Sequence, residues 1–308
     1  MTDFPRSLIE FQRRFGDEAA CAEYLVASRW PNGFACPACG TVKAWRLETK
    51  PWTYECASCG RQTSVTSGTI MHHSKLPLIV WFWAAYLMAT HSNGISALQL
   101  QRQLGLGSYK SAWLLCGKLR RAMVAPGRAP LAGLVEVDET ELPCRGQNDP
   151  LTGGGGRSHQ GKMPVVGAVE IQDGGPGRIR LVRSADYSAR SLHAFIAANL
   201  APGTTAKTDG WSGYPGAPGV RHDPHVVGPM AAHVVLPWVH RVFSNLKTWA
   251  LGVYHGLRRE HLQSYLDEFV FRFNRRRTRH AAFRSLLGIA AVIAPVTYKK
   301  LVSPEAQA

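Results

Sequence analysis

Four cysteines near the start of the sequence stand in two closely spaced pairs. Cys36 and Cys39 form the first pair and Cys56 and Cys59 form the second, which gives the pattern C-x2-C-x16-C-x2-C. A glycine follows each pair, and glycine relieves the backbone where a tight turn points two thiolates at one ion. Four thiolates at this spacing suit tetrahedral Zn²⁺ in a closed structural site. We predict that they bind zinc, because the alternative of two redox-active pairs lacks the surrounding βαβ pattern.

Two aspartates in the second half of the chain end short strand-like runs. Asp138 closes the apolar run GLVEVD, and Asp209 follows the run TTAKT. Carboxylates at strand ends suit Mg²⁺ or Mn²⁺, because one or two carboxylates hold such an ion together with waters and substrate phosphates. Two ions roughly 3.5–4 Å apart can clamp the attacking and leaving oxygens of an in-line displacement at phosphorus. An aspartate before a glycine also caps turns, so a structural role stays open for Asp209.

Residues 94–123 have the pattern of two short helices joined by a tight turn. The first helix ends at Gly105, and Ser108 can cap the second helix, which begins at Tyr109. This arrangement is typical of a helix-turn-helix, whose second helix enters the major groove of DNA. An ordinary helical hairpin is the alternative. The basic residues that the second helix would carry toward DNA are Lys110, Lys118, Arg120 and Arg121.

The charge of the whole chain also points to a polyanionic partner. The formal net charge is +15 and the isoelectric point is about 9.8. Double-stranded DNA is the partner that we expect for a chain of this charge. A run of three arginines, Arg275, Arg276 and Arg277, follows a predicted helix at 261–274 and could contact phosphates. A solvated basic face is the alternative interpretation of that run.

The sequence gives no sign of secretion or of membrane insertion. The N-terminus lacks the basic region followed by an apolar stretch that marks a signal peptide. The apolar run at 76–89 is shorter than the roughly 18 residues of a membrane span, so it predicts a buried helix. We therefore expect a cytoplasmic protein with no membrane partner. In that reducing compartment the seven cysteines do not form a disulfide framework.

Hydrophobic periodicity outlines the elements that must position these residues. Apolar residues at three- and four-residue spacings predict a helix over 5–28, and alternation predicts a strand over 134–138. The glycine-rich stretch at 144–162 is poor in apolar residues and predicts a long flexible loop. The remaining predictions are helices at 77–91, 189–200, 238–251 and 261–274, and strands at 163–171, 178–184 and 205–208.

The order of these motifs resembles that of the bacterial ISXO-type insertion-sequence transposases. The resemblance covers about residues 8–298 and rests on RWPNGFACPACG with the second cysteine pair, VEVDET, KTDGWSGY, VHRVFSNLKTW, GVYHG and HLQSYLDEFVFRFNRR. It implies an α/β fold class, with an RNase H-like mixed-sheet catalytic core preceded by a small zinc ribbon and a helical, helix-turn-helix-like segment. It also implies that Asp138 and Asp209 are the first two catalytic carboxylates of a DDE-type site.

The third catalytic position departs from the family pattern. Many relatives carry Glu or Asn there, whereas this sequence aligns His240 with that position and Lys247 with the family's trailing lysine. His240 and Lys247 are seven residues apart, so they share one edge of the helix's apolar stripe, and Asn245 lies on the other side. We therefore assign His240, with a surface histidine as the alternative. Imidazole is a less natural Mg²⁺ ligand, but its pKa suits orienting or deprotonating a water.

Together these features predict an insertion-sequence transposase that binds element ends and catalyses metal-dependent DNA cleavage and strand transfer. Because two ends must be brought together, we expect a homo-oligomer associated with the nucleoid. A catalytically inactive zinc/helix-turn-helix regulator derived from a transposase and a stand-alone nuclease are the alternatives. The expected domains are an N-terminal helix at 1–30, a zinc ribbon at 31–70, a helical DNA-binding segment at 71–127 and a catalytic core at 130–298.

Overall fold

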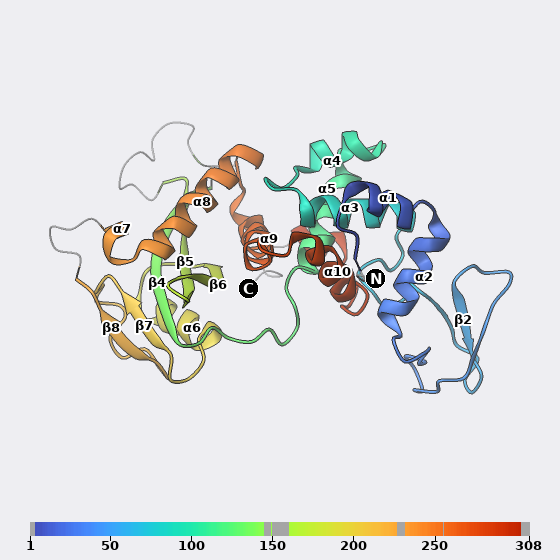
Figure 1. The fold of residues 1–308 in the computed structure, drawn as a ribbon, viewed down its shortest axis with the longest axis horizontal. Helices are drawn as coiled ribbons and strands as arrows, with labels where there is room; N and C mark the ends of the chain where they lie inside the picture. Colours follow the sequence, from blue (N-terminus) through green and yellow to red (C-terminus); the bar gives the residue numbers. More distant parts are fainter. Residues whose placement is uncertain (1–3, 145–148, 150–159, 227–231, 255, 303–308) are drawn as a thin grey trace. The chain divides into compact units, whose positions relative to one another are not determined.

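The contacts within the chain divide it into two units. The computed structural model describes residues 4–144, 149, 160–226, 232–254 and 256–302 (Figure 1). Unit 1 combines the residues up to Ala125 with Thr278–Leu301, and unit 2 covers Pro126–Arg277. We expected the second domain to run from 130 to 298. Instead, helix α10 (Arg279–Ala290) belongs to unit 1, where it packs against α3 (Leu78–Thr90).

The single helix expected over 5–28 is two helices in the structure. α1 spans Leu8–Arg14 and α2 spans Glu18–Arg29. The Asp17 side chain accepts a hydrogen bond from the Ala20 N–H at 2.8 Å, which gives α2 an N-terminal cap of its own. Apolar periodicity continues across the break because Phe15, at the end of α1, is still buried. The spacing of apolar residues therefore did not reveal the interruption.

Unit 1 continues with a small antiparallel sheet and a helical core. The sheet has the order β1-β2-β3, with β1 at Ala44–Arg46, β2 at Thr53–Cys56 and β3 at Gln62–Ser64. The predicted helix from the apolar run is α3, which is buried on nearly all sides against α2, α4, α5 and α10. Within the described ranges, no helix combines the length and apolarity needed to cross a membrane. The other helices are α4 at Ala97–Leu104, α5 at Tyr109–Arg121 and α11 at Tyr298–Val302.

Unit 2 is built on a five-stranded mixed sheet of order β6-β5-β4-β7-β8. β4, β5 and β6 are antiparallel neighbours, whereas β7 and β8 run parallel to β4. The expected mixed α/β class is confirmed. β8 was not predicted, because its four residues, RHDP, show no apolar alternation. Most of the loop predicted at 144–162 lies outside the described residues. The strands are β4 (Leu134–Pro143), β5 (Lys162–Gln172), β6 (Gly175–Arg183), β7 (Thr205–Thr208) and β8 (Arg221–Pro224).

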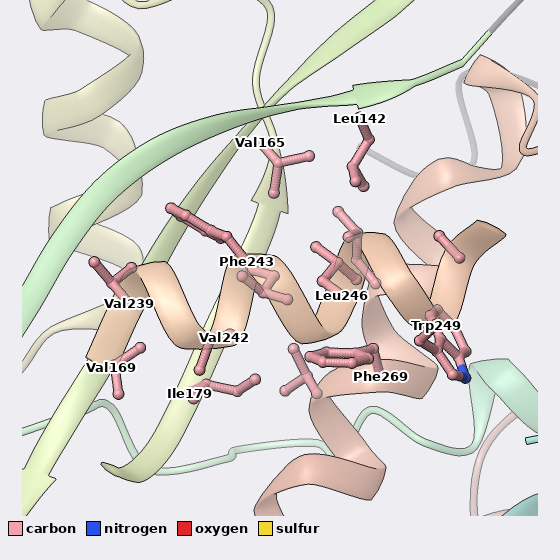
Figure 2. Packing of buried hydrophobic residues seen from close by; sticks show 14 of the residues in the cluster. Leu142, Val165, Val169, Ile179, Val239, Val242, Phe243, Leu246, Trp249 and Phe269 are labelled. Carbon is pink, nitrogen blue, oxygen red and sulfur yellow. The ribbon is translucent and has the colours of Figure 1, made fainter. Parts of the chain in front are cut away.

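Helices cover both faces of this sheet. α6 (Ala189–Asn199) packs on one face against Val135, Val137 and Ala206. α8 (Pro237–Tyr254) and α9 (Leu262–Asn274) cover the other face, where Phe243 and Leu246 of α8 point into a core with Val165 and Val169 (Figure 2). Two short elements, α7 (Ala232–Val235) and a 3₁₀ turn at Arg259–His261, flank α8 and α9.

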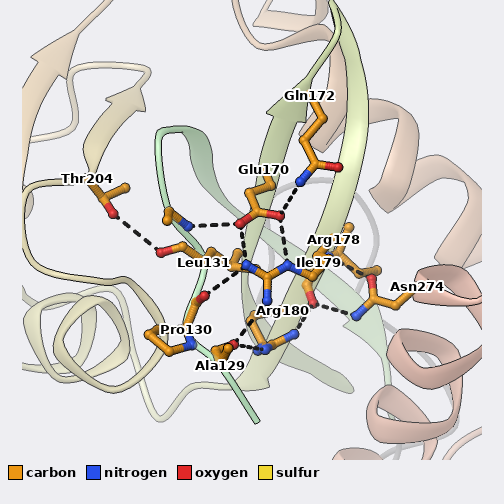
Figure 3. A network of polar contacts seen from close by, with 11 residues as sticks. Ala129, Pro130, Leu131, Glu170, Gln172, Arg178, Ile179, Arg180, Thr204 and Asn274 are labelled. Carbon is orange, nitrogen blue, oxygen red and sulfur yellow. Dashed lines mark hydrogen bonds and ion pairs between the residues drawn. The ribbon is translucent and has the colours of Figure 1, made fainter.

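Side chains from α9 pair with the outer edge of β6. Asn274 accepts from the Ile179 N–H at 2.8 Å and donates to the Ile179 carbonyl at 3.2 Å (Figure 3). Gln263, three helical turns earlier, accepts from the Arg183 N–H and donates to the Leu181 carbonyl. An open sheet edge presents backbone groups that can pair with another chain. Here the side-chain amides of Asn274 and Gln263 form hydrogen bonds with those backbone groups of β6 and hold α9 along the sheet.

A buried ion pair joins the sheet to the chain segment that enters it. Glu170 on β5 is only 2% exposed, and its carboxylate lies 2.5 Å from Arg178 on β6 (Figure 3). The same carboxylate accepts the Ala132 N–H at 2.9 Å, and Arg178 also donates to the Pro130 carbonyl. These bonds hold the segment just before β4 against β5 and β6.

Candidate functional site

The four paired cysteines converge in unit 1. Their sulfur atoms all lie within 4.8 Å of one another, and the Cys39–Cys56 Sγ distance is 3.5 Å. Gly40 and Gly60 adopt positive φ angles of 74° and 69°, and each donates its N–H to the carbonyl of the first cysteine of its pair. Four thiolates at these distances suit tetrahedral zinc. The structure thus confirms the geometry that the spacing predicted.

Arg29 fastens this small sheet to helix α2. Its guanidinium donates to the Ser64, Val65 and Ser67 carbonyls at 3.0, 2.7 and 2.5 Å. The guanidinium also lies over the Trp30 ring at 4.6 Å. One arginine therefore satisfies three carbonyls at the end of the ribbon and fixes its place within unit 1.

In unit 2 the two predicted aspartates lie on neighbouring parallel strands. Asp209 directly follows β7, whereas β4 runs on past Asp138 to Pro143, beyond the end at 138 that the sequence predicted. β4 and β7 pair Leu134 with Thr205 and Glu136 with Lys207. Two residues further along each strand, the same register brings Asp138 level with Asp209. Asp209 is half-buried just after β7, and its side chain accepts the Trp211 N–H at 2.9 Å. The turn-capping role that the sequence left open is present together with the placement beside Asp138.

A third acidic residue, Glu136, fixes the start of helix α8. It is 3% exposed, and its Oε2 accepts the N–H groups of Trp238 and Val239 at 2.8 and 2.9 Å. These amides belong to the first turn of α8, where no helical carbonyl is available to accept them. Because side chains alternate along a strand, Glu136 and Asp138 point to the same face of the sheet, toward α8. Sequence reasoning missed this role because the contact spans about a hundred residues.

A glycine allows α8 to lie close to the sheet. Gly167 on β5 pairs with Asp138 on β4. A Cβ atom at Gly167 would lie 2.5 Å from Cε1 and 2.8 Å from Cζ of Phe243. No real side chain fits at such distances, so only glycine permits Phe243 to pack over the strand beside Asp138. This close approach also places His240, one helical turn before Phe243, near Asp138 on β4.

His240 lies directly beside Asp138. Its Nε2 is 3.2 Å from Asp138 Oδ2, and its side chain is 28% exposed. Asn245 and Lys247 are both exposed on α8. Lys247 lines a cavity of about 400 Å³ with Arg258 and the end of β4. The structure therefore brings His240, and not Asn245, to the first aspartate.

Burial dominates the electrostatics of Asp138 and its acidic neighbours. Burial raises the pKa of Asp138 to about 8, and the carboxylates of Glu139, Asp209 and Glu136 act in the same direction. Burial likewise raises the pKa of Glu139 to about 7, with Asp209 adding to the effect. Such shifts arise where carboxyl groups are withdrawn from water and lie close to one another, so that they keep their protons to a higher pH than usual. Among the described residues, only the four cysteines gather three or more metal-ligating side chains within 4.8 Å.

Glu139 and Tyr214 add a second link between β4 and the segment after β7. The Tyr214 hydroxyl donates to Glu139 Oε1, and Tyr214 is fully buried. Burial, with the negative charge of Glu139, raises the pKa of Tyr214 well above its usual value. Both residues lie in the motifs VEVDET and KTDGWSGY, next to the two aspartates. Their adjacency to those aspartates was the available signal, but a glutamate–tyrosine contact leaves no periodic pattern that could have identified them.

The basic residues expected on the second helix of the helix-turn-helix differ widely in exposure. Arg120 is only 2% exposed, so it does not face solvent, and we remove it from the proposed DNA contacts. Lys118 is half-buried with its Nζ 5.8 Å from the Trp81 ring centre, and burial lowers its pKa. Lys110 and Arg121 are exposed. The helix itself has the expected caps, with Ser108 accepting the Ser111 N–H and Gly105 in the left-handed region.

The arginine run after α9 is largely engaged within unit 2. Arg275 lies over the Phe271 ring at 3.9 Å, and Arg276 lies over the Phe273 ring at 4.1 Å. Arg276 also donates to the Pro176 and Gly177 carbonyls at the start of β6. Arg277 is exposed. The first two arginines therefore secure the β5–β6 turn and the end of α9, which leaves Arg277 as the free-standing candidate for phosphate contact.

Two regions of the chain match known protein families, one in each part of the chain described above. Residues 130–274 match the ISXO2-like transposase domain, and residues 16–62 match the transposase zinc-ribbon domain. An uncharacterized protein in transposable element ISH50 of Halobacterium salinarum is 28% identical over 214 residues, covering 66% of this chain and 70% of that protein. The two domain matches include the cysteine cluster and the aspartate site. They leave α3 to α5, α10 and α11 outside.

Proposed function

We propose that this chain, which belongs to the ISXO2-like insertion-sequence transposases, binds the ends of its element and catalyses metal-dependent DNA cleavage and strand transfer. One observation carries the catalytic part of the proposal. Asp138 within β4 and Asp209 just after β7 stand level on two parallel strands, and His240 lies 3.2 Å from Asp138. The strand order of unit 2, with three antiparallel strands followed by two parallel ones, supports an RNase H-like core.

The residues of this site fit a hard divalent cation. Asp138 and Asp209 offer carboxylate oxygens, the ligands that Mg²⁺ and Mn²⁺ prefer. The raised pKa of Asp138, caused first by burial and then by neighbouring carboxylates, means that the protein alone does little to stabilise its charged form, which a bound cation would stabilise. These two aspartates would hold the ion. When bound, a divalent ion supplies positive charge for the phosphate oxygens and acidifies a water at the site.

His240 has a distinct role in this proposal. A neutral imidazole beside the site can accept the proton of the attacking water, and the carboxylate of Asp138 stabilises the imidazolium that results. In the first step a water oxygen bonds to phosphorus at the element end, and the bond from phosphorus to the 3′ oxygen breaks. In the second step the freed 3′-OH loses its proton and its oxygen bonds to a phosphorus of target DNA, while the bond from that phosphorus to the target strand's own 3′ oxygen breaks and that oxygen takes up a proton. Lys247 on the same helix is proposed to contact a DNA phosphate.

The test uses duplexes that carry the inverted repeats flanking the coding region, with a plasmid as target. Cleavage and joining are followed on gels while binding is measured in parallel. We expect Asp138→Asn and Asp209→Asn to abolish both reactions without loss of binding. His240→Ala should slow cleavage by about 10²–10⁴-fold, the range for losing a general base. Asn245→Ala, on the same helix, is the matched control and should react like the wild type.

The outcomes separate the alternatives. Unchanged cleavage by Asp138→Asn, or full activity of His240→Ala, would contradict the assigned site. Binding without any cleavage by the wild type would instead identify a regulator derived from a transposase. Cleavage without joining would identify a stand-alone nuclease. Sedimentation with and without paired ends tests the expected homo-oligomer, which should form when two ends are present.

A further inference from the structure

Two long stretches of this chain contain no acidic residue. No Asp or Glu occurs at 56–135 or at 269–304. The helices α3, α4, α5, α10 and α11 lie wholly within these stretches, and all of them contribute residues to unit 1. A solvated helical bundle ordinarily mixes charges of both signs on its surface. Unlike α1 and α2 of the same unit, these five helices carry no acidic side chain, and their lysines and arginines match a polyanion.

Helices α4 and α5 form a well-defined helix-turn-helix. α4 ends at Gly105, whose φ is 62°, and the Gln101 side chain donates to the Leu106 carbonyl across the turn. Ser108 then caps α5. The four-residue connection and its glycine are typical of helix-turn-helix motifs. Both helices pack on α3, which supplies the buried core that holds the pair in place.

Exposure along α5 identifies the end that can enter a groove. The second half of the helix is mainly buried, including Leu115, Cys116 and Leu119. At the N-terminal end, Tyr109 is 52% exposed and Lys110 is also exposed. The N-terminal residues of a recognition helix are the ones that contact base edges in the major groove. The first turn of α5 is therefore the part of this helix that can read DNA.

The C-terminal helix α11 packs beside this first turn. Lys110 Nζ lies 4.7 Å from the centre of the Tyr298 ring, and the Trp113 and Tyr298 ring centres are 6.3 Å apart. Leu301 is buried, and a Cβ at Gly117 would lie 3.4 Å from it. α11 thus follows positions 110, 113 and 117 along one side of α5. Its two lysines, Lys299 and Lys300, stay exposed next to that side.

We propose that the first turn of α5 and the lysines of α11 form one double-stranded DNA-binding surface, with Tyr109 and Lys110 reading base edges and Lys299 and Lys300 holding the phosphate backbone. The proposal rests on the proposed function, because it specifies which surface binds the element ends. It assigns a role to segments that neither the zinc-ribbon match at 16–62 nor the transposase-domain match at 130–274 includes. Residues almost 190 positions apart in the sequence meet at this surface.

Fluorescence anisotropy with the full-length chain tests this surface. The probes are a labelled duplex carrying one element end and an unrelated duplex of equal length, each titrated over a range of KCl concentrations. The variants are Tyr109→Ala, Lys110→Ala and the double change Lys299→Ala with Lys300→Ala. The matched control, Arg6→Ala with Arg13→Ala, removes the same charge from exposed positions at the N-terminal end of unit 1.

We expect different results for variants in the first turn of α5 and for the variant in α11. The double lysine variant should lose affinity for both duplexes about equally, and its salt slope should fall by about 2, roughly one unit per lost phosphate contact. Tyr109→Ala and Lys110→Ala should lower affinity for the element end about tenfold and reduce its advantage over the unrelated duplex. The arginine control should keep the wild-type preference for the element end.

Failure of this inference is distinguishable from failure of the proposed function. If the wild type prefers the element end but the α5 and α11 variants bind exactly as tightly with unchanged salt slopes, the surface is overturned while the transposase proposal stands. If the arginine control weakens binding as much as the lysine pair does, the effect is one of net charge and the surface is likewise overturned. A wild-type chain that binds neither duplex contradicts both proposals.

Discussion

Replacing Asp138 by asparagine should stabilise this protein while abolishing the proposed DNA cleavage. Burial and neighbouring carboxylates raise the pKa of Asp138 from 3.8 to about 8. In the unfolded chain this carboxyl ionises above its ordinary pKa, whereas in the folded chain it stays protonated until the pH approaches 8. The folded state therefore loses stability as the pH rises between these two values. Asparagine keeps the Oδ1 that accepts the Glu139 N–H at 2.8 Å and carries no charge.

The size of the effect follows from the shift. One pKa unit corresponds to about 1.4 kcal/mol. Near pH 7.5 the raised pKa of Asp138 therefore lowers the free energy of unfolding by roughly 4 to 5 kcal/mol. A domain of the size of unit 2 gains a few degrees per kcal/mol, so the variant should melt roughly 10 °C higher without divalent ions. Near pH 5 the difference should shrink to about 1–2 kcal/mol. Mg²⁺ should raise the melting temperature of the wild type but leave that of the variant nearly unchanged.

Differential scanning calorimetry over this pH range is the assay, and Glu170→Gln is the matched control on the same sheet. Burial acts to raise the pKa of Glu170, but the hydrogen bonds and charge of Arg178 outweigh it and hold that pKa below its usual value. Glu170→Gln should therefore be less stable than the wild type at neutral pH. This difference in stability should disappear as the pH falls through the range in which carboxyl groups take up protons. If Asp138→Asn melts no higher than the wild type near pH 7.5, the carboxylate of Asp138 does not destabilise the folded state and the reasoning fails.

Three further changes have defined outcomes. Gly167→Ala places a Cβ 2.5 Å from the Phe243 ring and should lower the free energy of unfolding, measured in urea, by about 1–3 kcal/mol. Adding Phe243→Leu should restore part of this loss, and an unchanged urea midpoint for Gly167→Ala would contradict the packing. Glu136→Ala leaves two amides of α8 without their acceptor and should cost about 1–3 kcal/mol, whereas Glu141→Ala, on the partly exposed part of β4, should cost less. Cys39→Ser should reduce bound zinc, measured by mass spectrometry, and open the segment at 31–68 to protease; retention of a full complement of zinc would rule out the four-thiolate site.

Local sequence patterns predicted the parts of the fold that local chemistry determines. The cysteine spacing, the caps at Gly105 and Ser108, the strand that precedes Asp209 and the first part of the strand that carries Asp138 all depend on residues close together in the chain. Where a contact spans a long distance in sequence, no such pattern exists. The Glu136 cap of α8 and the return of α10 to unit 1 are of this second kind. The burial of Arg120 was missed because a basic helix face gives no sign of which neighbours will cover it.

A histidine at the proposed third position fits the acidic groups that already surround Asp138. Glu136 and Glu139 lie on the same strand, and Asp209 stands level with it on the next. A further carboxylate on α8, 3.2 Å away, would raise the pKa of Asp138 again and deepen the strain of the ion-free protein. An imidazole adds no negative charge and can accept a proton. A histidine beside Asp138 therefore avoids that further rise in pKa, which fits the proposal that His240 stands at the third position of the site.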